Sequence, residues 1–512
     1  PARHGGGKRR DGGATWSIAL GTTVWGYNWS VPADGAYTLK TRATDSAGNV
    51  ELPGAGISVN AYRRQPSTIA INGRQLLVNG NPFLMKGVVY SPVPIGADPE
   101  AASPYGDYFT SGHNVVYNRD LPLLRQMGAN AVRLMVWDGA ADHHDFLDAA
   151  FNNGERPIYV IAGYWIDAGE DIVPDSPNNV REQLKTDFRQ MVATHKNHPA
   201  ILMWAIGNAL NADSMYGGNP GDLFSLVNEM AEEAHAEEGS SYHPVTTSLS
   251  DIDLLSTISA YDSSAPALDI WSANIYKGNT FGTLFSDYKA TSAKPLAILE
   301  YGIDAFDNAN GDEYENLGAP YQSTYAESLW NEVKANTDVC IGGSILEYSD
   351  EWWQGKYSAD PECPDDDPFF HSTCGSVSNS GPDGYDNAEW RGIMRTVENL
   401  SGTDYMQPRV VYYALQDVWT TLADAPQISV SPIAAIFDSV AVEGPPTVRT
   451  FTISNTGTDV LTISAITISG TNSADFVKQG DYCSGRTLIP SKTCTLQVMF
   501  SPSAAGPKTA VL

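Results

Sequence analysis

The sequence predicts a (β/α)₈ barrel flanked on both sides by β-sandwich modules. Short β-rich apolar runs alternate with long amphipathic stretches between about residues 67 and 422, whereas both ends of the chain are strand-like throughout. No glycine-rich phosphate-binding fingerprint follows any of the strands, which disfavours a doubly wound nucleotide-binding sheet. The 512 residues are also too many for one hydrophobic core. We therefore expect three domains, over residues 1–64, 65–424 and 425–512.

The two outer segments have the alternation of half-buried strands. Residues 14 to about 62 alternate apolar and polar residues between turns rich in Gly, Pro and Asp, after a glycine-rich start that we expect to be disordered. Their ending, ATDSAGNVE, resembles the last strands of bacterial immunoglobulin-like modules, so we expect part of such a module here. Residues 425–512 resemble a second bacterial β-sandwich, with an N-T-G turn and a late F-x-P strand.

The middle segment contains eight predicted strands and the helices between them. The strand candidates are 83–90, 130–136, 157–165, 200–208, 244–250, 269–276, 295–302 and 340–349. The helix candidates are 119–128, 143–153, 180–196, 221–239, 284–290, 325–335 and 410–422. Eight strands that are each followed by a helix are typical of a (β/α)₈ barrel, in which function gathers at the carboxyl ends of the strands.

Charge and cysteine content restrict the partners and the compartment. With 31 basic and 60 acidic residues the net charge is −29, which disfavours nucleic acid and anionic lipid as partners. No apolar run is long enough to span a bilayer, so we expect no membrane insertion. The pairs Cys363/Cys374 and Cys483/Cys494 favour two local disulfides over free thiols, and hence a secreted or cell-surface protein. No signal peptide is visible, and we expect a fragment that lacks both natural termini.

The carboxyl ends of the predicted strands carry aromatic, amide and acidic side chains. Flat aromatic rings stack on sugar C–H surfaces, amides and arginine bind sugar hydroxyls, and a carboxylate poised by Arg and Tyr can attack an anomeric carbon. This mixture predicts a carbohydrate site. The residues concerned are Tyr90, Arg133, Tyr164, Asn208, Asn274, Tyr276, Glu300, Glu347, Trp352 and Trp353.

Several runs in this segment resemble a known group of enzymes. The runs IAINGRQLLVNGNPFLMKGVVYSPVPIG, RDLPLLRQMGANAVRLM, HKNHPAILMWAIGN and ILEYG resemble the retaining glycosidases that hold two carboxylates on strands four and seven. The likeness is closest to the β-1,3-glucanosyltransferases of glycoside hydrolase family 72 and to the barrel domains of family 2. It extends over residues 67–422.

The resemblance implies a role for each matching residue. Glu300 matches the nucleophile, and Arg133 matches the strand-two arginine that keeps the nucleophile ionised. Asn208 matches the residue that bonds the sugar 2-hydroxyl, and Tyr276 matches the strand-six tyrosine that contacts the nucleophile. Platforms for sugar rings are expected at Trp352, Trp353 and Trp390.

The sequence departs from the family pattern at the residue that acts as general acid and base. The pattern at strand four is G-N-E, whereas this chain has G-N-A, with Ala209 in the place of the glutamate. A methyl group transfers no proton, and loss of the acid should cost roughly 10²–10⁴-fold in rate. Three explanations stay open: an engineered alanine, a natural protein that only binds glycan, or an acid relocated to Asp213, Glu347 or Glu351.

Plainer interpretations remain for several of these residues. Glu300 and Arg133 could form a structural ion pair, Tyr276 could be a core aromatic, and the tryptophans could pack against a loop. Glu347 could contact substrate or only support other residues. His143, His144 and Asp145 are expected to begin a solvated helix and not to bind a metal, and the acidic run 360–368 is expected to be a solvated turn and not a calcium loop.

These observations predict a retaining glycosidase or transglycosylase that acts by double displacement on a β-1,3-glucan-like polymer. No metal or organic cofactor is expected, and the partner is a β-linked oligosaccharide or polysaccharide. The alternatives are an inactive glycan-binding protein and a specificity of the β-galactosidase, β-mannanase or β-glucuronidase type. The strongly negative charge disfavours glucuronides.

Overall fold

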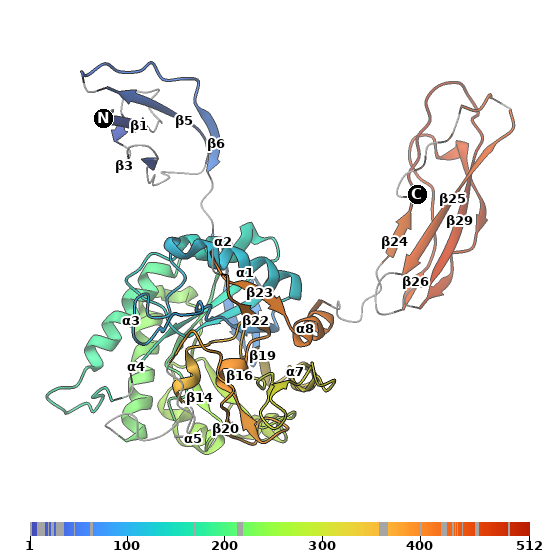
Figure 1. Cartoon of the computed structure of the whole chain (residues 1–512). Coiled ribbons are helices and arrows are strands. Elements are labelled where there is room, and N and C mark those ends of the chain that lie inside the picture. Colours follow the sequence, from blue (N-terminus) through green and yellow to red (C-terminus); the bar gives the residue numbers. More distant parts are fainter. Residues whose placement is uncertain are drawn as a thin grey trace.

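The computed structural model contains a closed barrel, shown in Figure 1, together with strand-rich parts at both ends of the chain. The residues it describes are 3–7, 16–18, 20–21, 25–26, 35–45, 47–61, 65–167, 169–211, 219–357, 367–399, 402–420, 428–432, 435, 437, 439–442, 444–455, 460–489 and 492–512.

The predicted barrel is confirmed. Eight parallel strands close on themselves in chain order, and each of them coincides with one of the eight predicted runs. Most of their side chains are buried, which explains why the strands appear in the sequence as nearly continuous apolar stretches. The strands are β10 (Met85–Val89), β11 (Ala131–Leu134), β12 (Tyr159–Tyr164), β13 (Ile201–Ile206), β14 (Val245–Ser250), β15 (Ile270–Ile275), β16 (Leu296–Tyr301) and β19 (Cys340–Ile345).

Helices surround the barrel and bury one apolar face each against it (Figure 1). The sequence predicts seven of them but not α5, whose segment LLSTISAY is rich in Ser and β-branched residues that form helices poorly. The helices are α1 (Asn114–Met127), α2 (His144–Phe151), α3 (Arg181–His195), α4 (Pro220–Glu238), α5 (Leu254–Tyr261), α6 (Leu284–Thr291), α7 (Tyr321–Ala335) and α8 (Val410–Thr420).

A three-stranded antiparallel sheet precedes the barrel, made of β7 (Ile69–Asn72), β8 (Gln75–Val78) and β9 (Asn81–Pro82). Its apolar side chains belong to the same core cluster as residues that point into the barrel from several strands. Because this sheet leads directly into the amino end of β10, it closes the end of the barrel opposite to the strands' carboxyl ends. Three short hairpins follow the last two barrel strands: β17 (Phe306–Asp307) with β18 (Asp312–Glu313), β20 (Ser376–Val377) with β21 (Tyr385–Asp386), and β22 (Met394–Val397) with β23 (Tyr405–Pro408).

The described residues at the two ends of the chain form antiparallel sheets. Before the barrel, β2 (Ser17–Ile18), β1 (Arg3–Gly7), β5 (Gly35–Thr44) and β6 (Ile57–Ala61) pair in that order, and β3 (Leu20–Gly21) pairs with β4 (Trp25–Gly26). After it, the sheet order is β24 (Ile428–Ser431), β25 (Thr447–Asn455), β29 (Thr493–Phe500) and β27 (Phe476–Asp481), while β26 (Leu461–Ile463) pairs with β28 (Arg486–Leu488). The domain boundaries and the immunoglobulin-like character of these parts remain predictions.

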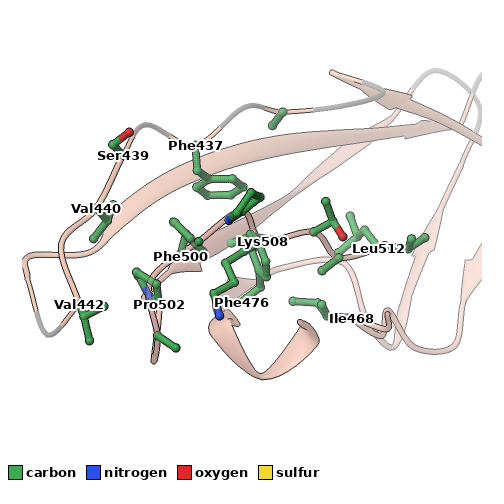
Figure 2. A pocket seen from close by; sticks show the side chains of 18 of the residues that line it. Phe437, Ser439, Val440, Val442, Ile468, Phe476, Phe500, Pro502, Lys508 and Leu512 are labelled. Atoms are coloured by element: carbon green, nitrogen blue, oxygen red, sulfur yellow. The ribbon is translucent and has the colours of Figure 1, made fainter. Parts of the chain in front are cut away.

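The carboxyl-terminal part has a disulfide and an apolar hollow. The predicted disulfide between Cys483 and Cys494 is confirmed. The hollow has a volume of about 1190 Å³, and Phe437, Phe476 and Phe500 contribute to its lining (Figure 2). The aromatic rings of Phe476 and Phe500 stack with their centroids 4.8 Å apart. No helix among the described residues is long and apolar enough to cross a membrane.

Candidate active site

Glu300 lies at the carboxyl end of β16, and both of its carboxyl oxygens are held. Arg133 on β11 donates from Nη1 to Oε1 at 2.6 Å, and Tyr276, which follows β15, donates its hydroxyl to Oε2 at 2.5 Å. Only 5 % of Glu300 is exposed. Burial and the Glu300 carboxylate raise the pKa of Tyr276 well above its usual value, so the phenol keeps the proton that it donates. The contact between Arg133 and Glu300 is a buried ion pair, in which opposite charges attract strongly because water is excluded.

Two asparagines, one after β13 and one on β15, extend this network, and Ser248 on β14 joins it. Arg133 donates from Nη2 to the Asn208 side-chain oxygen at 2.8 Å, and the Asn274 amide donates to the same oxygen at 2.9 Å. Ser248 on β14 in turn donates to the Asn274 oxygen at 2.5 Å. Side chains from β11, β14 and β16, and from or just after β13 and β15, are therefore joined at the carboxyl rim of the barrel.

Ala209 follows Asn208 in the turn after β13. Its φ is 50°, in the left-handed region that non-glycine residues seldom occupy, and Gly207 two residues earlier has a φ of 63°. The side chain is partly exposed. Residue 209 thus occupies a tight turn directly beside an amide that contacts Arg133, but its side chain has no group that can hold a proton.

Two buried acids stand where the chain leaves the last barrel strand. Glu347 and Glu351 are each only 2 % exposed, and Oε1 of each has no hydrogen-bond partner among the described residues. Burial and the neighbouring Glu351 carboxyl raise the pKa of Glu347 well above its usual range. Burial also raises the pKa of Glu351, to about 7, while contacts with Ser91 and Gln354 oppose the shift. These acids therefore hold protons more tightly than ordinary carboxyls do.

Arg391, which sequence reasoning missed, packs against the same region. Its guanidinium lies 5.4 Å from the centre of the Tyr276 ring, and its Nε donates to Asp386 at 3.1 Å. Burial opposes its charge, but the Asp386 carboxylate holds the pKa of Arg391 above its usual value. The sequence predicts a role for the adjoining Trp390. It has no local motif that predicts one for Arg391, which comes from a loop about 90 residues after β16.

The expected aromatic platforms are arranged differently from the prediction. Trp352 stacks on His371 with centroids 4.7 Å apart, and His371 stacks on Trp390 at 3.7 Å. Trp390 also packs on Phe306 at 4.7 Å. The ring of Trp390 is therefore occupied by protein contacts, and its expected use as an open platform is a correction to the sequence analysis. Trp352 and Trp353 are partly exposed, and their role stays a prediction.

Tyr90 and Tyr164 do not contribute to the rim as expected. Tyr90 is fully buried and donates its hydroxyl to Asp120 at 2.9 Å, as does Tyr348. Tyr164 packs edge-on against Phe188 of α3, between the barrel and its helices. Both predictions of sugar contact are therefore wrong, because the alternation along a strand directs these rings away from the rim.

Other predictions fall on side chains that the structure places elsewhere or leaves undescribed. His143 is buried beside Asp107, with Nε2 and Oδ2 2.9 Å apart, and α2 begins at His144. Within the described residues, no group of three or more His, Cys, Asp or Glu side chains could hold a metal ion. Three further predictions fall outside the described residues. They concern Asp213, the disulfide of Cys363 with Cys374, in which Cys363 is not described, and most of the acidic run 360–368.

Comparison with known proteins now decides the family. The family model described as "Glycosyl hydrolases family 2, TIM barrel domain" matches residues 69–360, which is more than half of the chain. The chain belongs to glycosyl hydrolase family 2. This confirms one of the two resemblances drawn from the sequence, whereas the likeness to family 72 stays a prediction.

Several curated glycosidases are similar to part of this family 2 chain. A mouse β-glucuronidase is 23% identical over 316 residues, which cover 56% of this chain and 42% of the relative. A cat β-glucuronidase is 26% identical over 328 residues, covering 60% and 44%. A β-galactosidase of Alteromonas mediterranea is 26% identical over 202 residues, covering 37% and 17%. The chain thus spans less than half the length of these relatives. Among solved structures, a β-glucuronidase of Bacteroides uniformis aligns with a TM-score of 0.48 and 16% identity, over 98% of this chain and 54% of the other.

Proposed function

We propose that this chain is the barrel of a retaining β-glycosidase whose nucleophile is Glu300. The observation that carries the proposal is the pair of contacts on the Glu300 carboxyl, one from a guanidinium and one from a phenol. A structural ion pair would need only the first contact. Membership of family 2 supports the same assignment, because glycosidases with carboxylates at these strand ends act by double displacement.

In the first step, one Glu300 oxygen attacks the anomeric carbon of a β-glycoside. The bond from that carbon to the leaving oxygen breaks with its electron pair, and an α-linked glycosyl ester forms on Glu300. Arg133 and Tyr276 hold the carboxylate in place before the attack, so that little reorganisation is needed when its charge is consumed. In the second step, the oxygen of water or of a sugar hydroxyl attacks the same carbon. The bond from that carbon to the Glu300 oxygen breaks with its electron pair, the attacking group's proton passes to solvent, and the Glu300 carboxylate is regenerated.

Ala209 limits which substrates this site can turn over. A leaving group that needs a proton receives none from residue 209, whereas an aryl oxide of low basicity can depart without one. The second step also lacks a general base, so the glycosyl ester should accumulate. The proposal is therefore a site that forms the covalent intermediate from activated glycosides and resolves it slowly.

The identity of the sugar is a separate matter. A β-1,3-glucan-like substrate remains the expectation from sequence, while the printed names of the relatives point to glucuronides and galactosides for those proteins. A specificity of the β-galactosidase type is one of the alternatives expected from the sequence, and it agrees with the printed name of the Alteromonas relative. The Cys483–Cys494 disulfide supports an extracellular location. A glycan-binding protein without turnover is the second candidate, and Ala209 is the observation that favours it.

Stopped-flow measurement with 2,4-dinitrophenyl β-glycosides tests the proposal. We expect a burst of dinitrophenolate equal to the enzyme concentration, followed by slow turnover, and no turnover of the matching methyl glycosides. Azide should accelerate the slow phase and yield a β-glycosyl azide, because a small anion fits where a glutamate side chain is missing.

The same experiment separates the two candidates. The glycan-binding candidate predicts no burst with any leaving group, although calorimetry would still detect binding. A glycosyl azide of α configuration would contradict the retaining mechanism, since two inversions at one carbon restore the original configuration.

A further inference from the structure

The chain segment that carries Arg391 is tied to the ends of two neighbouring barrel strands. After β16, the Ala305 N–H donates to the Trp390 carbonyl at 2.9 Å. After β19, which pairs with β16, the Glu347 N–H donates to the Arg391 carbonyl at 3.2 Å. Gln322 of α7 donates from Nε2 to the same carbonyl at 3.3 Å. The backbone position of Arg391 is therefore set by two strand ends and one barrel helix.

The Arg391 side chain is held by one acid, Asp386. The guanidinium donates from Nε to Oδ1 at 3.1 Å and from Nη2 to Oδ2. A two-pronged contact of this kind fixes the plane of a guanidinium as well as the place of its charge. Asp386 lies on β21, which pairs with β20, so a hairpin outside the barrel orients Arg391.

The guanidinium of Arg391 lies over the phenol that contacts the proposed nucleophile. It is 5.4 Å from the centre of the Tyr276 ring, and the Tyr276 hydroxyl donates to Glu300 Oε2 at 2.5 Å. A cation at this distance is attracted to the face of an aromatic ring, and the attraction grows where water is excluded. Because the hydroxyl is at the end of a rigid ring, any tilt of the ring moves the donor relative to the Glu300 carboxyl.

The charge of Arg391 also affects the hydroxyl itself. Burial and the Glu300 carboxylate raise the pKa of Tyr276, and the Arg391 charge opposes that shift. A cation beside a phenol stabilises negative charge on its oxygen, which makes the hydroxyl a stronger hydrogen-bond donor. An ion pair that served only the hairpin would need no contact with Tyr276.

We propose that Arg391 is a positioning residue for the nucleophile: with Asp386, it holds the Tyr276 ring in the orientation from which the hydroxyl donates to Glu300. This inference rests on the proposed function, because it gives Arg391 a part in the attack by Glu300. Arg391 acts through Tyr276 and not on the sugar. It lies beyond residues 69–360, the range that the family model matches, so family membership does not assign it this part.

A double-mutant cycle between residues 391 and 276 tests the inference. The 2,4-dinitrophenyl β-D-glucoside, β-D-galactoside and β-D-glucuronide are each mixed with the wild-type chain, and the one that reacts fastest is used throughout. We expect Arg391→Met to slow the burst at saturating substrate by roughly 5- to 20-fold in the wild type, but by less than about 2-fold in Tyr276→Phe, which has no hydroxyl to position. The substrate concentration that gives half the maximal burst rate should not change.

The outcomes separate this inference from the proposed function. The same factor in both backgrounds overturns the inference, because Arg391 would then act without the Tyr276 hydroxyl. A change confined to the half-saturating concentration also overturns it, since Arg391 would then bind the substrate. Either result leaves the proposed function intact. No burst with any of the three substrates contradicts the proposed function, and the inference falls with it.

Arg395→Met is the matched control. Arg395 lies four residues later on β22 and donates from Nε to Glu313 at 2.6 Å. Its side chain is 19% exposed, compared with 20% for Arg391. The variant loses a similar ion pair and should leave the burst rate unchanged. An equal loss of rate in Arg395→Met would mean that the effect is a general loss of stability and would overturn the inference.

Two further variants keep the test decisive. Arg391→Lys, which keeps the charge but not the two-pronged contact, should recover part of the rate that Arg391→Met loses. If Arg391→Met does not fold, the cycle is run with Asp386→Asn, which removes the charge that holds the guanidinium. Slowing by equal factors with and without the Tyr276 hydroxyl would then overturn the inference.

Discussion

The acids at the ends of strands seven and eight are equally buried but differently supported. Glu300 has a donor on each carboxyl oxygen, and one of those donors carries a full positive charge. Glu347 and Glu351 each have an oxygen without a donor within the described residues, and each faces other acids. Neighbouring strands of one barrel thus present a carboxyl held by an arginine and a tyrosine, and a pair of acids whose pKa values are raised by burial.

This difference shows that burial alone does not set the chemistry of an acid. Removing a carboxyl from water disfavours its charge, and only donors or cations reverse that effect. Of the three acids Glu300, Glu347 and Glu351, only Glu300 has an ion pair with an arginine within 4 Å among the described residues. The predictions below remove one feature of this contrast at a time.

The largest effect is expected from Glu300→Gln. An amide cannot attack the anomeric carbon, so the burst with activated glycosides should fall by on the order of 10³-fold or more, as for loss of a nucleophile elsewhere. Stopped-flow absorbance measures it, with circular dichroism to establish that the variant is folded. A burst of unchanged amplitude would place the nucleophile on another residue.

Ala209→Glu should act in the opposite direction. A carboxyl at this turn restores a proton donor, so turnover of unactivated β-glycosides should rise by roughly 10²–10⁴-fold. Ala209→Gln is the matched control, since it has the same size without the proton. If the glutamate and glutamine variants behave alike on methyl and disaccharide substrates, the turn after β13 does not present residue 209 to the leaving group.

Arg133→Met tests how much the ion pair between Arg133 and Glu300 contributes to the stability of the fold. It leaves the Glu300 charge buried without its cation, which should lower the free energy of unfolding by about 3–5 kcal/mol. Denaturant unfolding measures this loss. The double variant Arg133→Met/Glu300→Gln should regain part of it because no unpaired charge remains. Strictly additive losses would mean that the two side chains do not stabilise each other.

A smaller effect is expected from Tyr276→Phe. It removes one hydrogen bond to a charged group, an interaction of about 1.5–3 kcal/mol, so formation of the glycosyl ester should slow by roughly 10- to 100-fold. Phe keeps the ring under Arg391, and the fold should be unaffected. A change confined to KM would instead assign Tyr276 to substrate binding.

The smallest effect is the pH dependence of the stability that Glu351 contributes. Because the pKa of Glu351 is raised to about 7 from an ordinary value of 4.5, the folded state binds more protons than the unfolded state between these two pH values. This group should therefore stabilise the fold most below about pH 4.5, and its contribution should fall by at most roughly 1 kcal/mol per pH unit up to pH 7. Unfolding at pH 5 and 7 should show this decline in the wild type and in the control variant Glu182→Gln, whose side chain is 86% exposed on α3, but less of it in Glu351→Gln. A steeper decline in Glu351→Gln would reverse the assigned sign.

The barrel and the centre of the site could be predicted from sequence because their signals are local. Each buried strand is a continuous apolar run, and residues at or just after its carboxyl end lie at the rim, which places Arg133, Asn208, Tyr276 and Glu300 together. What could not be predicted depends on which way a ring turns or on contacts across many residues. Tyr90 is directed to a buried aspartate, and Trp390 is covered by His371, which comes from a separate turn. Arg391 reaches Tyr276 from a loop more than 100 residues later, without a motif that announces it.

The most direct measurement of the central claim is the mass of the protein after reaction with a 2,4-dinitrophenyl 2-deoxy-2-fluoro-β-glycoside. The fluorine slows the second step, so the ester persists through proteolysis. Our account predicts one added glycosyl group per chain, on the peptide that contains Glu300, and none in Glu300→Gln. An unmodified protein, or a label on Glu347 or Glu351 instead, would contradict it.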